Sequence, residues 1–122
     1  LSTGASVACP NRKTIALQAD GSGMYTLQGL WTQARERLDV VTIILNNRGY
    51  AILQHEMKNV GVPVHGGNAE RMMRIDDPGL NWVALAAGMG VDGARAHSCA
   101  EFSDLLARAL RQTGPFLIEA MI

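Results

Sequence analysis

A nearly continuous apolar run at residues 40–45 constrains the fold of this chain more than any other feature. A strand with one wet face alternates apolar and polar residues, whereas an unbroken run is typical of a parallel strand covered on both faces. The run ends abruptly at Asn46-Asn47-Arg48-Gly49, as expected where a strand enters a loop. Helices must then cover both faces of the sheet, so we predict a three-layer α/β domain.

The rest of the sequence alternates between strand and helix patterns. Strand patterns occupy residues 14–19, 91–97 and 116–122, and helix patterns occupy residues 24–38, 50–59, 81–89 and 99–113. Residues 60–80 have no clear period and are expected to form an irregular loop. No hairpin signal separates the strands, so right-handed crossovers and a parallel sheet are expected.

Three local signals mark the ends of helices. Asp20-Gly21-Ser22-Gly23 is typical of a turn, so a helix is expected to begin just beyond it. Ser98 and Glu101 fit a capping box, in which a hydroxyl and a carboxylate each satisfy a free backbone N–H at a helix start. Gly114 is expected to take the left-handed position that ends the same helix.

The charge and hydropathy of the chain exclude two kinds of partner. Lys and Arg number 11 and Asp and Glu number 11, and basic residues occur in scattered pairs such as Arg35/Arg37 and Arg71/Arg74. Because no basic stripe could neutralise a run of phosphates, nucleic acid is not expected as a partner. The apolar runs fall far short of the roughly 20 residues needed to span a bilayer, so no membrane segment is expected.

The first residue and the two cysteines bear on the origin of the chain. The sequence starts at Leu1, without Met and in the middle of a pattern, so we expect a domain truncated at its N-terminus and cut from a longer enzyme.

Cys9 and Cys99 lie far apart and lack metal-ligand spacing. They are expected to be buried free thiols, which suits a cytoplasmic location.

Several aromatic residues and histidines have simple structural interpretations. Trp31, Trp82 and Phe102 fit core positions, and His55 and His97 are expected to face solvent. We expect His65 to lie in the irregular loop.

Two loops carry residues suited to a metal ion. Asp20 follows the strand at 14–19 and Asn47 follows the strand at 40–45, so both loops are expected at the same edge of a parallel sheet. Asp20 offers a carboxylate oxygen, Asn47 an amide oxygen and Gly49 a backbone carbonyl. Such an all-oxygen set of modest charge suits Mg²⁺, which usually shares its shell with phosphate and water.

Gly21 and Ser22 complete a site of this kind. Their N–H groups and the Ser22 hydroxyl precede an expected helix N-terminus, which attracts anions. A metal-bridged diphosphate is therefore the expected ligand. The spacing from Asp20 to Asn47 corresponds to one loop, one helix and one strand, the unit that would bring both residues to one metal. Taken singly, each motif also fits a plain turn or strand end.

The segment Ala19-Asp20-Gly21-Ser22, followed later by Asn46-Asn47, resembles the fingerprint of thiamine-diphosphate enzymes, normally Gly-Asp-Gly, one helix and strand, then Asn-Asn. Ala19 replaces the first glycine of that pattern. Over essentially all 122 residues the chain is similar to the thiamine-diphosphate-binding (PP-type) C-terminal domain of the acetolactate synthase and benzoylformate decarboxylase family. Further similar stretches are Met24-Tyr25-Thr26, Leu30-Trp31-Thr32, Asn47-Arg48-Gly49-Tyr50, Asp77-Pro78-Gly79-Leu80, Gly88-Met89-Gly90-Val91 and Gly114-Pro115-Phe116-Leu117-Ile118-Glu119.

The resemblance implies roles for particular residues. Mg²⁺ would be bound by Asp20, Asn47 and the Gly49 carbonyl, thiamine diphosphate would touch Gly21 and Ser22, and the remaining cofactor-site residues would be Tyr25, Tyr50 and Leu53. For Tyr25 a core position is an equal alternative. The pyruvate decarboxylase branch carries a glutamate where this chain has Leu53, which argues against that branch. No catalytic residue is expected here, because the activating glutamate of the family comes from a separate pyrimidine-binding domain.

The resemblance also implies an activity for a longer enzyme of which residues 1–122 would be one domain. That activity is acetolactate-synthase-like: decarboxylation of a 2-oxo acid and transfer of the carbanion to a second oxo acid. The alternatives are a benzoylformate-decarboxylase-like enzyme, a flavodoxin-like nucleotide-binding module and a degenerate subunit kept for assembly. A pyrimidine-binding domain of the same or a partner subunit, a homodimer or homotetramer, and inactivity of these residues alone are also implied.

Overall fold

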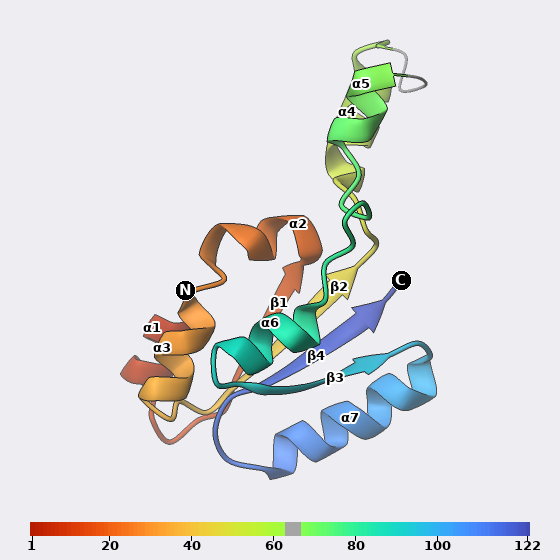
Figure 1. Cartoon of the computed structure of the whole chain (residues 1–122). Coiled ribbons are helices and arrows are strands. Elements are labelled where there is room, and N and C mark those ends of the chain that lie inside the picture. The colour runs from red at the N-terminus through yellow and green to blue at the C-terminus, as the bar shows by residue number, and fades with distance from the viewer. Residues whose placement is uncertain (63–66) are drawn as a thin grey trace.

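The computed structural model describes residues 1–62 and 67–122. Its four strands form one parallel sheet in the order β1-β2-β4-β3 (Figure 1). The strands are β1 (Thr14–Ala19), β2 (Val40–Asn46), β3 (Asp92–Ala96) and β4 (Phe116–Met121). The parallel α/β sheet predicted from the apolar runs is confirmed.

Helices cover both faces of the sheet, which completes the three layers. On one face Ile44 and Leu117 pack with Trp82 of α6 (Trp82–Gly88) and with α3 (Gly29–Arg35). On the other face Val41 and Ile118 pack against α7 (Cys99–Arg111). Side chains of β2 are thus buried in both directions, which is why this strand lacks the alternation of a half-wet strand.

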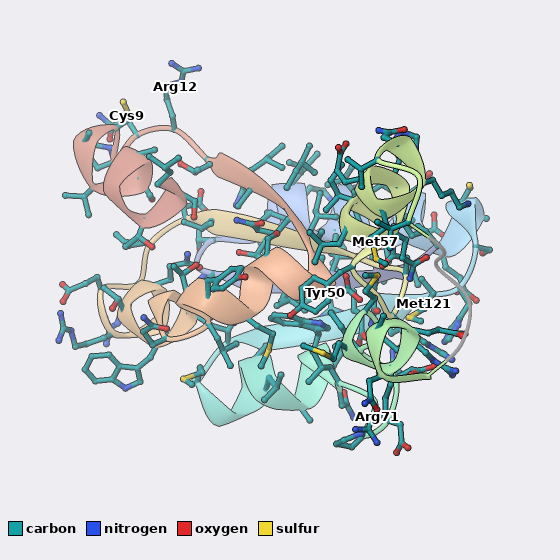
Figure 2. All side chains as sticks on the ribbon, turned by 90° about the horizontal axis from the view of Figure 1, so that it is seen from above. Cys9, Arg12, Tyr50, Met57, Arg71 and Met121 are labelled. Atoms are coloured by element: carbon teal, nitrogen blue, oxygen red, sulfur yellow. The ribbon has the colours of Figure 1, made fainter. Side chains whose placement is uncertain are left out.

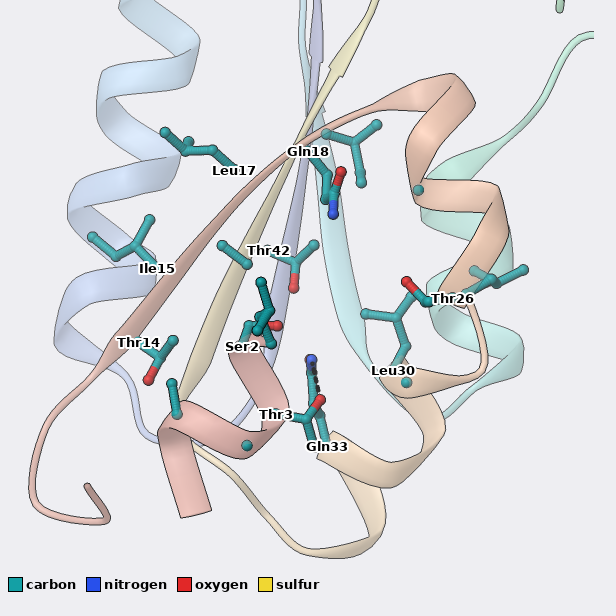
Figure 3. A pocket seen from close by; sticks show the side chains of 18 of the residues that line it. Ser2, Thr3, Thr14, Ile15, Leu17, Gln18, Thr26, Leu30, Gln33 and Thr42 are labelled. Carbon is teal, nitrogen blue, oxygen red and sulfur yellow. Dashed lines mark hydrogen bonds between the residues drawn. The ribbon is translucent and has the colours of Figure 1, made fainter. Parts of the chain in front are cut away.

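A first helix, α1 (Ser2–Ala8), was not expected from the sequence. It packs beside β1 and α3, where Gln33 Nε2 donates to Thr3 Oγ1 at 3.2 Å (Figure 3). Its residues are small, so they show no helical period of large apolar side chains. A cavity of about 950 Å³ lies between α1, α3 and β1, on a face of the sheet and not at its carboxyl edge.

The helix predicted for residues 24–38 differs in its bounds. The chain becomes helical already at Asp20 and forms α2 (Asp20–Gly23), the 3-10 turn η1 (Met24–Thr26) and then α3. Position 23 of α2 requires glycine, because a Cβ there would meet Trp82 Cη2 at 2.7 Å. The glycines of this segment therefore serve close packing inside a helical turn, and the turn predicted at 20–23 is wrong.

Two helices form an arm that rises from the carboxyl edge of the sheet (Figure 1). They are α4 (Ala51–Asn59) and α5 (Gly67–Met72). The prediction of α4 is confirmed, whereas α5 lies in the segment expected to be irregular. Residues 63–66, which include His65, lie outside the described residues.

The capping box before α7 is confirmed in part. Glu101 N donates to Ser98 Oγ at 3.2 Å, while the Glu101 carboxylate accepts from the N–H of His97 at 2.7 Å and not from that of Ser98. The helix ends at Arg111, three residues before Gly114. Gly114 does have a positive φ, 89°, but it lies in the connection to β4 and does not cap the helix.

Three side chains expected in the core are exposed instead. Trp31 is 50 % exposed, and the Arg35 guanidinium stacks on its ring at 4.7 Å. Cys9 and Cys99 are free and exposed. By contrast, Trp82 is buried, Phe102 packs against the α7-side core, and His55 and His97 are exposed as expected. Among the described residues, every helix is too short or too polar to cross a membrane.

Candidate functional site

The loops after β1 and β2 meet at the carboxyl edge of the sheet, as predicted. The register pairs Ala19 with Leu45, so Asp20 lies level with Asn46, the last residue of β2, and the loop at 47–50 follows directly. The loops touch directly, because a Cβ placed on Gly21 would lie 2.4 Å from Tyr50 Cε1. Figure 2 views the molecule from above this edge and labels Tyr50. Glycine at position 21 is therefore required by the approach of the second loop.

Asp20 has one carboxylate oxygen that no described residue satisfies. The residue is 1 % exposed, and Oδ1 accepts from the N–H of Gly21 at 2.9 Å. Oδ2 is buried and has no hydrogen-bond partner among the described residues. Burying an unpaired charged oxygen is costly unless a cation or a donor compensates it. This atom is therefore the strongest sign that the edge accommodates a positively charged group.

The loop after β2 is a sharp turn held by two asparagine side chains. Asn46 Oδ1 accepts from the N–H of Arg48 at 3.0 Å, and Asn47 Oδ1 accepts from the N–H of Gly49 at 3.1 Å. Arg48, which follows the two asparagines, adopts a φ of 60°, a left-handed conformation that is unusual for arginine. The turn leaves Asn47 exposed at the edge.

A segment that follows α5 fixes the same loop from the other side. Tyr50 N donates to the Met73 carbonyl and Ile75 N to the Arg48 carbonyl, both at 2.8 Å. This bridge does not use the Gly49 carbonyl. No pattern in the sequence predicts this contact, since residues 60–80 show no period and the pairing spans an entire helical arm.

The residues present fit a small divalent cation. Asp20 Oδ2, Asn47 Oδ1 and the Gly49 carbonyl are all oxygen donors, the kind that Mg²⁺ prefers. The described residues hold no cluster of three or more His, Cys, Asp or Glu side chains, so a site of the acid-rich or thiolate kind is absent from them. A set with a single carboxylate leaves room for the negative charge of a phosphate ligand.

The other predicted cofactor residues are less closely gathered. Ser22 Oγ donates to Gln18 Oε1 at 2.6 Å, so its proton is already used within the chain. Tyr25 is 78 % exposed on η1, which rules out its alternative as a core residue, and Leu53 is 49 % exposed on α4. The helix that begins at Asp20 has four residues, so its dipole contributes less than the longer predicted helix would.

Sequence reasoning missed a buried polar network beside the Asn47 loop. Glu119 of β4 is 0 % exposed and accepts from Asn46 Nδ2 at 2.7 Å and from Arg95 Nε at 2.9 Å. A cavity of about 280 Å³ lies over these residues. The available signal was a glutamate inside the apolar closing strand, a position that requires a partner when the strand is buried.

An exposed ion pair lies on the segment that follows α5. Arg74 Nε donates to both carboxylate oxygens of Asp76 at 3.0 Å. The hydrogen bond from Arg74 holds the pKa of Asp76 below its ordinary value, and the pKa of Arg74 is raised in return. The pair thus adds local order to the segment that bridges to Arg48 and Tyr50.

Comparison with protein families gives one match over nearly the whole chain. The model described as "Thiamine pyrophosphate enzyme, C-terminal TPP binding domain" matches residues 1–120. A Mycobacterium tuberculosis protein named for the acetolactate synthase large subunit, IlvX, is 45 % identical over 120 residues, which cover 98 % of this chain and 23 % of the relative. A benzoylformate decarboxylase of Pseudomonas aeruginosa is 36 % identical over 116 residues, 95 % of this chain and 21 % of the relative.

Solved structures agree with these sequence matches. The thiamine diphosphate-dependent 4-hydroxybenzoylformate decarboxylase of Rhodococcus jostii RHA1 superposes with a TM-score of 0.86 at 35 % identity, over 97 % of this chain and 21 % of that one. Benzoylformate decarboxylase from Polynucleobacter necessarius gives 0.84 at 26 % identity, over 100 % of this chain and 22 % of that one. The chain thus spans about a fifth of the length of its relatives.

Proposed function

The chain belongs to the family of thiamine pyrophosphate (TPP) enzyme C-terminal TPP-binding domains, and we propose that its sheet edge holds the diphosphate of TPP through Mg²⁺. One observation carries the metal assignment: Asp20 buries a carboxylate oxygen that lacks a partner among the described residues. A divalent cation at Oδ2 would compensate that charge. The family match and the similar structure of a decarboxylase named as thiamine diphosphate-dependent support the cofactor.

Each residue of the edge has a separate task in this proposal. Asp20, Asn47 and the Gly49 carbonyl hold the ion, and the Gly21 and Ser22 backbone faces the diphosphate. Tyr50 packs on Gly21 and keeps the two loops in contact. When bound, TPP supplies the electron sink for decarboxylation of a 2-oxo acid, while the protein supplies position and electrostatics.

We further propose an acetolactate-synthase-like reaction for the whole enzyme. The 45 % identity to the relative named IlvX supports it, and Leu53 offers an apolar side chain on α4 near the edge. A benzoylformate-decarboxylase-like activity is the second candidate, favoured by the TM-score of 0.86 to a 4-hydroxybenzoylformate decarboxylase. Acetolactate formed from pyruvate supports the first, and benzaldehyde formed from benzoylformate supports the second.

The same proposal assigns partners to the chain. A pyrimidine-binding domain, from the same or a partner subunit, would provide the activating glutamate, in a cytoplasmic homodimer or homotetramer. Residues 1–122 alone would then bind the cofactor without turning over a 2-oxo acid. Decarboxylation by these residues alone would contradict that assignment.

Calorimetric titration of the intact protein with TPP, with and without Mg²⁺, tests the metal site. Binding is expected to require Mg²⁺, and Asp20→Ala is expected to weaken it by on the order of 100-fold or more, since removing a direct ligand should cost at least as much as removing a residue that orients one. Asp104→Ala, an exposed acidic position on α7, is the matched control and should leave the titration unchanged. Binding of a flavin or nucleotide in place of TPP would favour a nucleotide-binding module.

A further inference from the structure

We propose that Glu119 is a positioning residue for the Mg²⁺ site, acting through Asn46 on the turn that presents Asn47 and Gly49. This inference rests on the proposed function, because it concerns how the same edge is held in shape. Glu119 is not itself a ligand in this proposal, since both of its carboxylate oxygens are already used by protein donors.

The network crosses three neighbouring strands. Arg95 of β3, Glu119 of β4 and Asn46 of β2 follow one another across the sheet order β2-β4-β3. Glu119 is fully buried, whereas the Arg95 side chain is 36 % exposed. A buried carboxylate is expensive even when paired, and well-packed apolar residues are often at least as stable. Retaining it here is best explained by what it holds, not by the stability it adds.

Glu119 determines which way the Asn46 carboxamide faces. Because Nδ2 of Asn46 donates to Glu119 at 2.7 Å, Oδ1 is turned to the N–H of Arg48 at 3.0 Å. The Asn46 backbone carbonyl accepts in addition from Ile122 N at 3.1 Å. Asn46 is only 4 % exposed, so water has little access to replace these partners.

The Asn46 side chain stabilises the strained backbone of Arg48. Arg48 has a φ of 60°, which costs an L-residue roughly 1–2 kcal/mol and persists only where the surroundings enforce it. Its N–H is held by Asn46 Oδ1, and the next turn places Gly49 N on Asn47 Oδ1 at 3.1 Å. Glu119 thus acts on the proposed ligands indirectly: it orients Asn46, and Asn46 holds the backbone turn that presents Asn47 and Gly49.

The other end of the network is anchored in a helix. Arg95 Nη2 donates to Asn81 Oδ1 at 3.4 Å, and the same oxygen caps α6 by accepting from Ala84 N at 3.1 Å. The hydrogen bonds from Asn46 through Glu119 and Arg95 to Asn81 therefore connect the loop after β2 to α6; we call this chain of hydrogen bonds the brace. A group anchored in this way is suited to holding a ligand in one position.

Glu119→Gln in the intact protein tests the proposal with little change of volume. Glutamine offers one acceptor oxygen and one NH₂ group, so either Asn46 or Arg95 loses its acceptor. Mg²⁺ affinity, titrated at saturating TPP, is expected to fall about 10- to 100-fold, as for residues that orient metal ligands. Asp39→Asn, which breaks the ion pair with Lys13 at the opposite edge of the sheet, is the control and should leave Mg²⁺ affinity unchanged.

A second substitution can restore the pattern of donors and acceptors. In Glu119→Gln combined with Asn46→Asp, the new amide donates to the new carboxylate and its oxygen accepts from Arg95. The remaining carboxylate oxygen at position 46 still accepts from Arg48 N. Most of the lost affinity should return, which loss of packing alone would not allow. Wild-type affinity in Glu119→Gln, or a double variant no tighter than that single variant, overturns the proposal.

Hydrogen exchange of the metal-free protein separates this inference from the proposed function. Glu119→Gln should speed exchange at the amides of Arg48 and Gly49, and Asp39→Asn should not. If the wild type fails to bind Mg²⁺ with TPP, the proposed function is wrong while exchange still reports on the brace. Unchanged exchange at both amides shows that Glu119 does not hold the turn.

Discussion

The two loops at the carboxyl edge differ in whether their polar side chains have hydrogen-bond partners. In the loop after β2, the side chains of Asn46 and Asn47 both accept backbone N–H groups, and Glu119 braces the first of them. In the loop after β1, Asp20 buries a carboxylate whose Oδ2 has no partner among the described residues. One loop is organised in advance, whereas the other retains a buried oxygen that no described residue satisfies. Their contact at Gly21 and Tyr50 joins the two properties into one site.

Separating the loops should have the largest effect on stability. Gly21→Ala places a Cβ 2.4 Å from Tyr50 Cε1 and 3.2 Å from Ile75 Cδ1, so the loop after β2 must move. We expect the free energy of unfolding to fall by about 1–3 kcal/mol, as for overpacked sites. Mg²⁺-dependent binding of TPP should weaken as well. Urea unfolding measures the first and calorimetry the second.

Two further variants isolate the clash. Gly4→Ala in α1 has no atom within 4 Å of the added Cβ and should be neutral or slightly stabilising. Gly21→Ala with Tyr50→Ala removes the obstructing ring and should be less destabilised than the sum of the single changes. Strict additivity of the two would mean that the loops do not meet through this pair.

Neutralising the unpaired carboxylate should move stability the other way. Asp20→Asn keeps an oxygen for the Gly21 N–H and replaces the buried carboxylate by a neutral amide, whose burial costs less, so the metal-free protein is expected to gain on the order of 1 kcal/mol. Mg²⁺ affinity should fall in the same variant. Thermal unfolding in EDTA and calorimetry with Mg²⁺ and TPP measure the two effects.

A surface control shows whether that gain is specific. Asp104→Asn removes an exposed carboxylate of α7 and should change neither quantity. A metal-free Asp20→Asn protein that is less stable than the wild type would show that the carboxylate is compensated within the chain, and the contrast between the loops would disappear.

The sheet could be predicted because its signals are local. The apolar run at 40–45 and the segment at 14–19 each report burial of their own strand, and both coincide with strands of the structure within one residue. The placement of Asp20 and Asn47 at one edge then follows from parallel topology. Strands that are marked by their own local sequence pattern could therefore be predicted.

The parts that were missed depend on residues far apart in the chain. The pairing of Asn46 with Glu119 joins positions 73 residues apart, and no pattern around either residue reveals it. Gly21 and Gly23 resemble turn glycines in sequence, although each is required by an aromatic ring from another segment. Tertiary contact, not local propensity, decides such positions, so only the folded structure shows them.

Removing one side-chain oxygen from the organised loop should have a smaller effect than opening it. Asn47→Ala deletes the acceptor for Gly49 N, and we expect a loss of about 1 kcal/mol in unfolding free energy, typical of one hydrogen bond. Mg²⁺ affinity should fall much more steeply, because Asn47 is also a proposed ligand. Asn59→Ala, on the exposed arm, is the matched control. Equal affinity in Asn47→Ala and the wild type would remove Asn47 from the site.

The smallest effect is expected at the exposed pair on the segment that supports the organised loop. Because the Arg74 hydrogen bond lowers the pKa of Asp76 from its ordinary value of 3.8, the pair stabilises the fold above that pH. This contribution is lost as the pH falls through the lowered pKa. Arg74→Gln should therefore melt slightly below the wild type at pH 7, and the difference should vanish in acid. Arg12→Gln, near the opposite edge of the sheet, should show no such pH-dependent difference. The difference in melting temperature between Arg74→Gln and the wild type could instead widen on acidification. Arg74 would then not stabilise the carboxylate form of Asp76, and the backbone bridge alone would hold the segment.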